Sequence, residues 1–181
     1  MDVDAWREEL ESYRARKDEQ FRGRQSPLPP EEREEFDGLA YFDPDPAYRV
    51  EATVEPIDSD ETVRMETTAG GEQLYERAAR LRFELGDDER TLVAYQRVDH
   101  EEGSLFVPFR DKTTGQQTYP AGRYMELHYE GSLDDLDEET TVPVDFNLAY
   151  SPFCAYSDAY DCPLPPAENW LETEIRAGER Y

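Results

Sequence analysis

A period-two alternation of apolar and polar residues runs through the middle of the chain and limits the folds that it can adopt. It begins at Tyr48, after which Val50, Ala52 and Val54 alternate with charged or hydroxyl side chains. Similar segments follow at residues 63–68, 78–86, 90–98, 104–111, 123–129 and 141–150. Because successive side chains of a strand point to opposite faces, the pattern predicts strands that each bury one face.

Turn residues separate these segments at Gly70–Gly71, Gly86–Asp87 and Gly103. No long amphipathic helix interrupts the chain between Tyr48 and Tyr150, so neighbouring strands are expected to pair antiparallel. The sequence therefore predicts a mainly β fold of about seven strands, built either as an antiparallel β-sandwich or as a partly open barrel.

Residues 4–21 have a helical rather than a strand period, with Trp6, Leu10, Tyr13 and Phe21 on one face. We expect Asp4 to cap this helix and Gly23 to end it. A length of 181 residues favours a single domain, 1–181. We divide it into a helical N-terminal segment (1–45), an antiparallel β body (46–150) and a Pro-rich C-terminal strap (151–181).

The net charge of −25 arises from 44 acidic against 19 basic residues, of which only Lys17 and Lys112 are lysines. An acidic, Lys-poor surface is typical of proteins adapted to molar salt, where charge repulsion is screened. Nucleic acid and anionic membranes are not expected partners, because neither is attracted to such a surface. The chain begins without a basic, apolar leader and has no long apolar run, which predicts a soluble cytoplasmic protein.

The densest group of chemically unusual residues lies between Phe106 and Pro166. Asp145 and Asn147 are two apart in a predicted strand, so their side chains should share one face. Arg123, in the strand that precedes in sequence, is the expected partner of the Asp145 carboxylate. Two interpretations remain open: an internal ion pair that joins two loops, or a site in which Asp145 acts as a base or ligand and Arg123 binds an anionic group.

Residues 111–119 form a predicted turn, in which Asp111 accepts hydrogen bonds from the amides around Thr113 and Gly115 adopts a positive φ. Its hydroxyls and glycine are also compatible with phosphate binding, although the segment does not match a P-loop. Tyr119 follows the turn and is expected either to brace a strand corner or to point into a pocket.

Cys154 and Cys162 are separated by seven residues, which is not the spacing of a zinc-binding pair. His100 and His128 are the two histidines, and nothing in the sequence places them near the cysteines, so no metal site is predicted. We expect two small thiols packed in a Pro-rich loop rather than a disulfide, because the cytoplasm is reducing.

Several segments together resemble a known family. They are RKDEQF (16–21), SPLP (26–29), FDGLAYFDPDPAYRV (36–50), FVPFRDKTTGQQTYPAGRY (106–124), DFNLAYSPFCAY (145–156), CPLPPAEN (162–169) and IRAGE (175–179). In this order they are similar to the domain of unknown function 1684, and the resemblance covers nearly the whole chain. It implies a small soluble domain with no established reaction, so no catalytic residue or cofactor follows from it.

The leading functional hypothesis is a small-molecule ligand bound in a polar pocket lined by Asp111, Tyr119, Arg123, Asp145, Asn147 and Tyr150. A second is a hydrolase- or lyase-like enzyme with Asp145 as general base and Arg123 as the group that binds an oxyanion or carboxylate. A third is a protein-interaction module that uses the aromatic side chains of the tail, Phe153, Tyr156, Tyr160 and Trp170.

Overall fold

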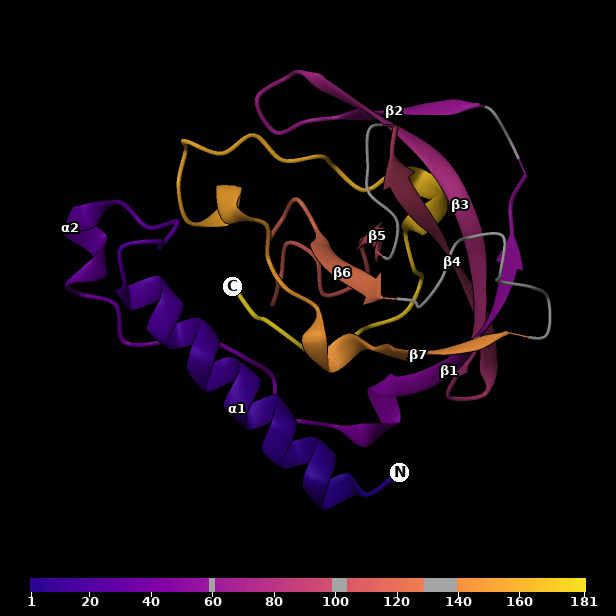
Figure 1. Cartoon of the computed structure of the whole chain (residues 1–181), viewed down its shortest axis with the longest axis horizontal. Helices are drawn as coiled ribbons and strands as arrows, with labels where there is room; N and C mark the ends of the chain where they lie inside the picture. The colour runs from indigo at the N-terminus through magenta and orange to yellow at the C-terminus, as the bar shows by residue number, and fades with distance from the viewer. Residues whose placement is uncertain (59–60, 99–103, 129–139) are drawn as a thin grey trace.

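Antiparallel strands form one curled sheet in a computed structural model that describes residues 1–58, 61–98, 104–128 and 140–181 (Figure 1). The strands are β1 (Arg49–Pro56), β2 (Thr62–Glu66), β3 (Glu72–Leu85), β4 (Asp88–Arg97), β5 (Ser104–Phe109), β6 (Arg123–His128) and β7 (Thr141–Asp145). The prediction of a mainly β fold of about seven strands is confirmed. The turn predicted at Gly103 lies outside the described residues.

The order of the strands shows that the sheet is a half-barrel and not a sandwich. Neighbours follow the path β6-β5-β4-β3-β1-β7, while β2 pairs with β3 beside this path. The curl brings the two ends together, because Tyr150, just beyond β7, exchanges backbone hydrogen bonds of 2.8 and 3.0 Å with Tyr124 of β6. A register shift between Arg77 and Ala79 in β3 marks a bulge of the kind that increases sheet curvature.

The two faces of the sheet bury different clusters, as the period-two pattern predicts. In β4, Leu92 and Ala94 join the main core on the concave face, while Val93 and Tyr95 join a smaller cluster on the other face. The main core contains apolar residues of six strands, and Phe146 lies within it. Leu171, Ile175 and Ala177 of the C-terminal strap complete it. The strap is thus part of the core rather than an outer layer.

Helix α1 (Val3–Arg22) crosses the open side of the half-barrel and buries Trp6, Leu10 and Phe21 (Figure 1). Its cap is Asp2 and not Asp4: Asp2 Oδ1 accepts hydrogen bonds from the amides of Asp4 and Ala5, so Asp4 belongs to the first turn. Gly23 ends the helix as predicted. In the part of the chain that the structure describes, no helix is long and apolar enough to cross a membrane.

Short helices occupy the connections. They are α2 (Pro30–Arg33) and the 3₁₀ helices η1 (Pro46–Tyr48), η3 (Phe146–Leu148), η4 (Phe153–Ala155) and η5 (Ala167–Asn169). The Asn169 side chain joins η5 to the sheet, because it donates to the carbonyls of Val93 and Pro108 and accepts from the Val93 amide.

Gly178 should tolerate a methyl group much less well than Gly86. Both glycines have a positive φ, +81° and +65°, so Ala costs about 1–2 kcal/mol of backbone strain at either position. At Gly178 the new Cβ would also lie 2.6 Å from the Ala149 carbonyl oxygen, whereas at Gly86 it would meet no atom within 4 Å. We expect Gly178→Ala to lower the free energy of unfolding by about 1–3 kcal/mol more than Gly86→Ala. Urea unfolding in molar KCl measures both, and equal losses would contradict the close packing of the strap.

Candidate functional site

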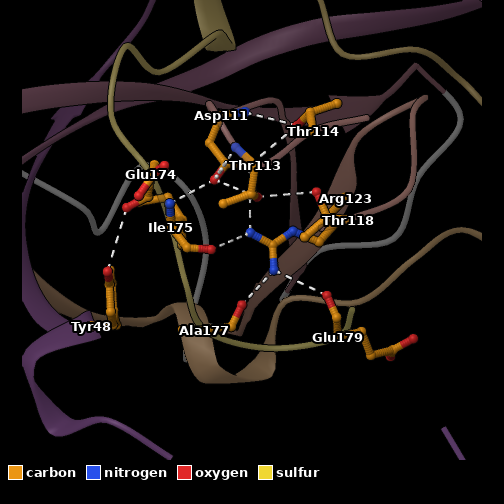
Figure 2. A network of polar contacts seen from close by, with 10 residues as sticks. All are labelled: Tyr48, Asp111, Thr113, Thr114, Thr118, Arg123, Glu174, Ile175, Ala177 and Glu179. Atoms are coloured by element: carbon orange, nitrogen blue, oxygen red, sulfur yellow. Dashed lines mark hydrogen bonds and ion pairs between the residues drawn. The ribbon is translucent and has the colours of Figure 1, made fainter. Parts of the chain in front are cut away.

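The Arg123 guanidinium is fully buried at the start of β6 and is surrounded by polar groups of the C-terminal strap (Figure 2). It donates hydrogen bonds to three backbone carbonyls: Ile175 at 2.8 Å, Glu179 at 3.2 Å, and Ala177. The carbonyls of residues 175, 177 and 179 converge on the guanidinium, whose five N–H donors allow it to bind several acceptors at once. Arg123 therefore fixes the position of the strap.

Asp111 supplies the charge that balances Arg123. Its Oδ1 lies 3.6 Å from Arg123 Nη2, and its Oδ2 accepts hydrogen bonds from the Ile175 amide at 2.6 Å and the Thr113 hydroxyl at 2.8 Å. Burial lowers the pKa of Arg123, and the Asp111 carboxylate opposes this shift. The predicted cap is confirmed, because Asp111 accepts from the Thr113 amide and Gly115 has a φ of +82°.

Asp145 has partners other than Arg123, contrary to the sequence expectation. The reason is strand order: β7 pairs with β1 and not with β6. Asp145 Oδ2 accepts a hydrogen bond from the Trp6 indole at 2.7 Å, and Oδ1 accepts from the amide and side chain of Asn147 at 3.0 and 2.8 Å. These bonds attach α1 to the end of the sheet.

Asn147 does not share a strand face with Asp145, because β7 ends at Asp145 and η3 begins at the next residue. Asp145 caps this short helix. Asn147, in the helix, is buried, with 2 % of its surface exposed. The Asn147 side chain pairs with the backbone of Asp45, accepting from its amide at 3.0 Å and donating to its carbonyl at 2.9 Å. It therefore joins the segment before β1 to the turn after β7.

Tyr119 and Tyr150 lie in different places. The Tyr119 hydroxyl donates to Cys154 Sγ at 3.6 Å and its ring contacts Tyr181, which makes Tyr119 a brace between loops. The Tyr150 hydroxyl donates to Glu126 Oε1 at 3.0 Å, and Lys17 Nζ lies 4.8 Å from its ring centroid. Burial and the Glu126 carboxylate raise the pKa of Tyr150.

A buried carboxylate, Glu179, anchors the second half of α1. Its side chain is 1 % exposed and pairs with Lys17 of the helix. It also accepts hydrogen bonds from the Tyr156 hydroxyl at 2.8 Å and the Ser151 amide at 3.3 Å. Burial followed by the Glu179 charge raises the pKa of Tyr156. Helix, strap and the segment after β7 therefore meet at one carboxylate.

A groove of about 930 Å³ lies between α1 and the ends of β6 and β7. Its aromatic wall contains Trp6, Tyr13 and Tyr150. Met125, Leu127 and Pro143 add apolar surface, and the charged side chains include Arg16, Arg49, Glu126 and Asp145. A smaller hollow of about 390 Å³ shares Tyr13, Arg16, Glu126 and Tyr150, so the groove continues along the helix toward Gln20.

Of the six residues predicted to line a pocket, Asp145 and Tyr150 lie at this groove. Asp111 and Arg123 are together in the buried network, while Asn147 and Tyr119 make the structural contacts described above. Four groove residues, Trp6, Tyr13, Arg16 and Arg49, were not predicted from the sequence. The spacing of Trp6 and Tyr13 on one helix face was visible, but it was interpreted as core packing.

The cysteines, the histidines and the aromatic tail are the remaining candidates from the sequence. Cys154 and Cys162 are free thiols, and no group of three His, Cys, Asp or Glu side chains that could hold a metal ion is found within the described ranges. His100 lies outside these ranges. In the aromatic tail, the rings of Phe153 and Tyr156 contact Phe21 of α1, at centroid distances of 6.4 and 5.1 Å.

Comparisons with known proteins identify the family of this chain and a solved structure that is similar to it. A family model described as "Protein of unknown function (DUF1684)" matches residues 34–180. The chain belongs to this family. A solution NMR structure of an uncharacterised protein from Haloarcula marismortui is similar over 99 % of this chain and 96 % of its own, with 53 % identity and a TM-score of 0.76. A search among curated proteins finds no match.

The segments that carry the DUF1684 resemblance mostly supply the scaffold. Asp111 and Arg123 lie in the 106–124 segment, and the carbonyls that Arg123 binds lie in IRAGE (175–179). Asn169, at the end of CPLPPAEN, joins η5 to the sheet. The matched region begins after α1, so one wall of the groove lies outside it.

Replacing Arg123 with Met should cost about 3–5 kcal/mol of unfolding free energy, because it leaves the Asp111 carboxylate buried without its cation. The double variant Asp111→Asn, Arg123→Met removes that charge and should recover part of the loss. Urea unfolding in molar KCl measures both proteins. A loss below about 1 kcal/mol for the single variant would contradict a structural role for the pair.

Proposed function

We propose that this DUF1684 protein binds a small organic molecule in the groove between α1 and the sheet. The observation that supports this most is the size of the groove. Its volume of about 930 Å³ falls within the range of small-molecule binding sites. About half of its lining residues are apolar or aromatic, and six are charged: Glu8, Glu9, Arg16, Arg49, Glu126 and Asp145. Such a lining suits a ligand with an apolar body and one polar group.

The charged side chains differ in how firmly they are engaged. Both oxygens of Asp145 accept hydrogen bonds from the protein, so this carboxylate supports the groove wall and is not a free base. Within the described ranges, Arg49 makes only a long ion pair with Glu51, at 3.8 Å. Among the described residues, no hydrogen bond or ion pair engages Arg16. Arg16 and Arg49 are therefore the groups that we expect to bind the polar part of the ligand.

Filling the groove provides the test. Ser12 lines it from the middle of α1, whereas the neighbouring Glu11 does not, although both residues are exposed. We expect ligands found by NMR fragment screening in molar KCl to lose at least about tenfold in affinity for Ser12→Trp. Glu11→Trp adds the same side chain to the same helix and should bind them as the wild type does.

Two results would contradict the proposal. One is equal affinity of the two Trp variants for every ligand found, which would place binding elsewhere. The other is a fragment library from which nothing binds the folded wild-type protein.

A further inference from the structure

The groove runs along an edge of the sheet where the hydrogen-bonded ladder stops. Strand β6 pairs with β5 on one side. On its other side, the partner within the described ranges is Tyr150, which exchanges two backbone hydrogen bonds with Tyr124. The chain just before Tyr150 is the short helix η3, so it cannot continue this ladder. The rest of β6, residues 125–128, lines the groove instead.

The register of the sheet decides which backbone groups of β6 face the groove. Tyr124 bonds to Tyr150, so its N–H and C=O point away from β5, where the opposite residue is Pro108. Backbone groups of an antiparallel strand alternate between its two sides. The N–H and C=O groups of Glu126 and His128 therefore also point away from β5. In the part of the chain that the structure describes, no backbone hydrogen bond reaches them on that side.

The edge of β7, which also lines the groove, is less suited to pairing. The Val54 amide donates to the Thr140 carbonyl, which places the hydrogen-bonded pairs of β1 and β7 at every second residue from there. Pro143 lies between two such pairs, so its backbone nitrogen faces outward and offers no donor. Proline is a common means of blocking a strand edge, and β6 contains none. The edge that can accept a further strand is therefore that of β6.

Arg16 lies near the end of this open edge. A strand that paired antiparallel with β6, as Tyr150 does, would have its C-terminus toward Tyr150. The smaller hollow at this place is lined by both Tyr150 and Arg16. A guanidinium binds a carboxylate through two parallel hydrogen bonds, and Arg16 has no such partner among the residues described. The edge thus combines backbone groups for a strand with a cation for its terminal carboxylate.

We propose that the ligand of the groove is a short peptide with a free C-terminal carboxylate, which adds a strand to the open edge of β6. This inference rests on the function proposed above and names the class of its ligand. The peptide exchanges backbone hydrogen bonds with Glu126 and His128, and Arg16 binds its carboxylate. At about 3.3 Å per residue, the open edge accommodates about three or four peptide residues.

The two faces of β6 determine which side chains the peptide should carry. Met125 belongs to the main core and Leu127 packs against it, whereas Glu126 is exposed. Directly opposite residues of an antiparallel pair have their side chains on the same face. We therefore expect an apolar peptide residue opposite Leu127 and polar residues on either side of it.

Hydrogen exchange tests whether the peptide pairs with β6. The probes are N-acetylated tetrapeptides that alternate threonine with valine or leucine and end in a free carboxylate, added to the wild-type protein in molar KCl. Bound peptide should slow exchange of the Glu126 and His128 amides at least about tenfold, because it supplies their acceptors. Amides of Met125 and Leu127, which face β5, should be slow in both states. Binding without protection of Glu126 and His128, or no binding by any peptide of the set, would overturn the proposal.

Esters in the peptide backbone provide a second test of strand pairing. An ester in place of one amide removes a single N–H donor. Affinity should fall about two- to tenfold where that N–H points toward β6 and should be unchanged at the positions between. Losses of equal size at every position would contradict an added strand.

Arg16→Gln tests how the carboxylate is bound. This variant should bind the peptide acid at least about tenfold more weakly, while its affinity for the C-terminal amide of the same peptide changes less than about twofold. Arg7→Gln makes the same substitution on the same helix outside the groove, and it should bind both as the wild type does. An equal loss for acid and amide in Arg16→Gln would contradict carboxylate binding by Arg16.

Ser12→Trp separates this inference from the function on which it rests. If fragments bind the wild type and lose affinity in Ser12→Trp, but no peptide binds, the groove is a small-molecule site and the peptide inference alone is wrong. If neither fragments nor peptides bind the wild type, both are wrong. Peptides that bind the wild type and lose at least about tenfold in Ser12→Trp would support both.

Discussion

A single buried guanidinium organises this fold. Arg123 binds three carbonyls of the C-terminal strap and is balanced by Asp111, which also accepts a hydrogen bond from the strap amide of Ile175. Removing a charge from water is costly unless hydrogen bonds and a counter-charge compensate it, and here both are present. The strap then places Ile175 and Ala177 in the main core. A half-barrel whose concave face would otherwise be open is thereby filled by its own C-terminus.

The helix is attached through polar contacts at both ends, and the groove is the space that this attachment leaves. Trp6 donates to Asp145 near the start of α1, and Lys17 pairs with the buried Glu179 farther along. Between these points, side chains of the helix and of the sheet line a hollow instead of closing it. Asp145, which looked catalytic in the sequence, supports the groove wall in this arrangement, because both of its carboxylate oxygens accept hydrogen bonds from the protein.

The strand pattern and the turn chemistry were sufficient to predict the class of fold. The alternation after Tyr48 correctly indicated a mainly β fold of about seven antiparallel strands, although it left a sandwich and a partly open barrel as alternatives. The Asp111 turn formed as expected. The partners of the charged groups could not be predicted in the same way, because they depend on the order of the strands in the sheet. The order of the strands along the sequence suggested that Asp145 pairs with Arg123. In the structure, β7 lies beside β1 and not beside β6. The groove was also missed, since helix spacing shows that Trp6 faces the body but not how closely the body approaches it.

The central claim is that the C-terminal strap belongs to the cooperative core because Arg123 and Asp111 hold it there. Native-state hydrogen exchange of the wild-type protein, followed in increasing urea, tests this most directly. The Ile175 amide, bonded to Asp111, should open with the same free energy as the amide of Leu92 in the centre of the sheet. If Ile175 exchanges through a local opening that costs several kcal/mol less, the strap is an accessory layer and the account is wrong.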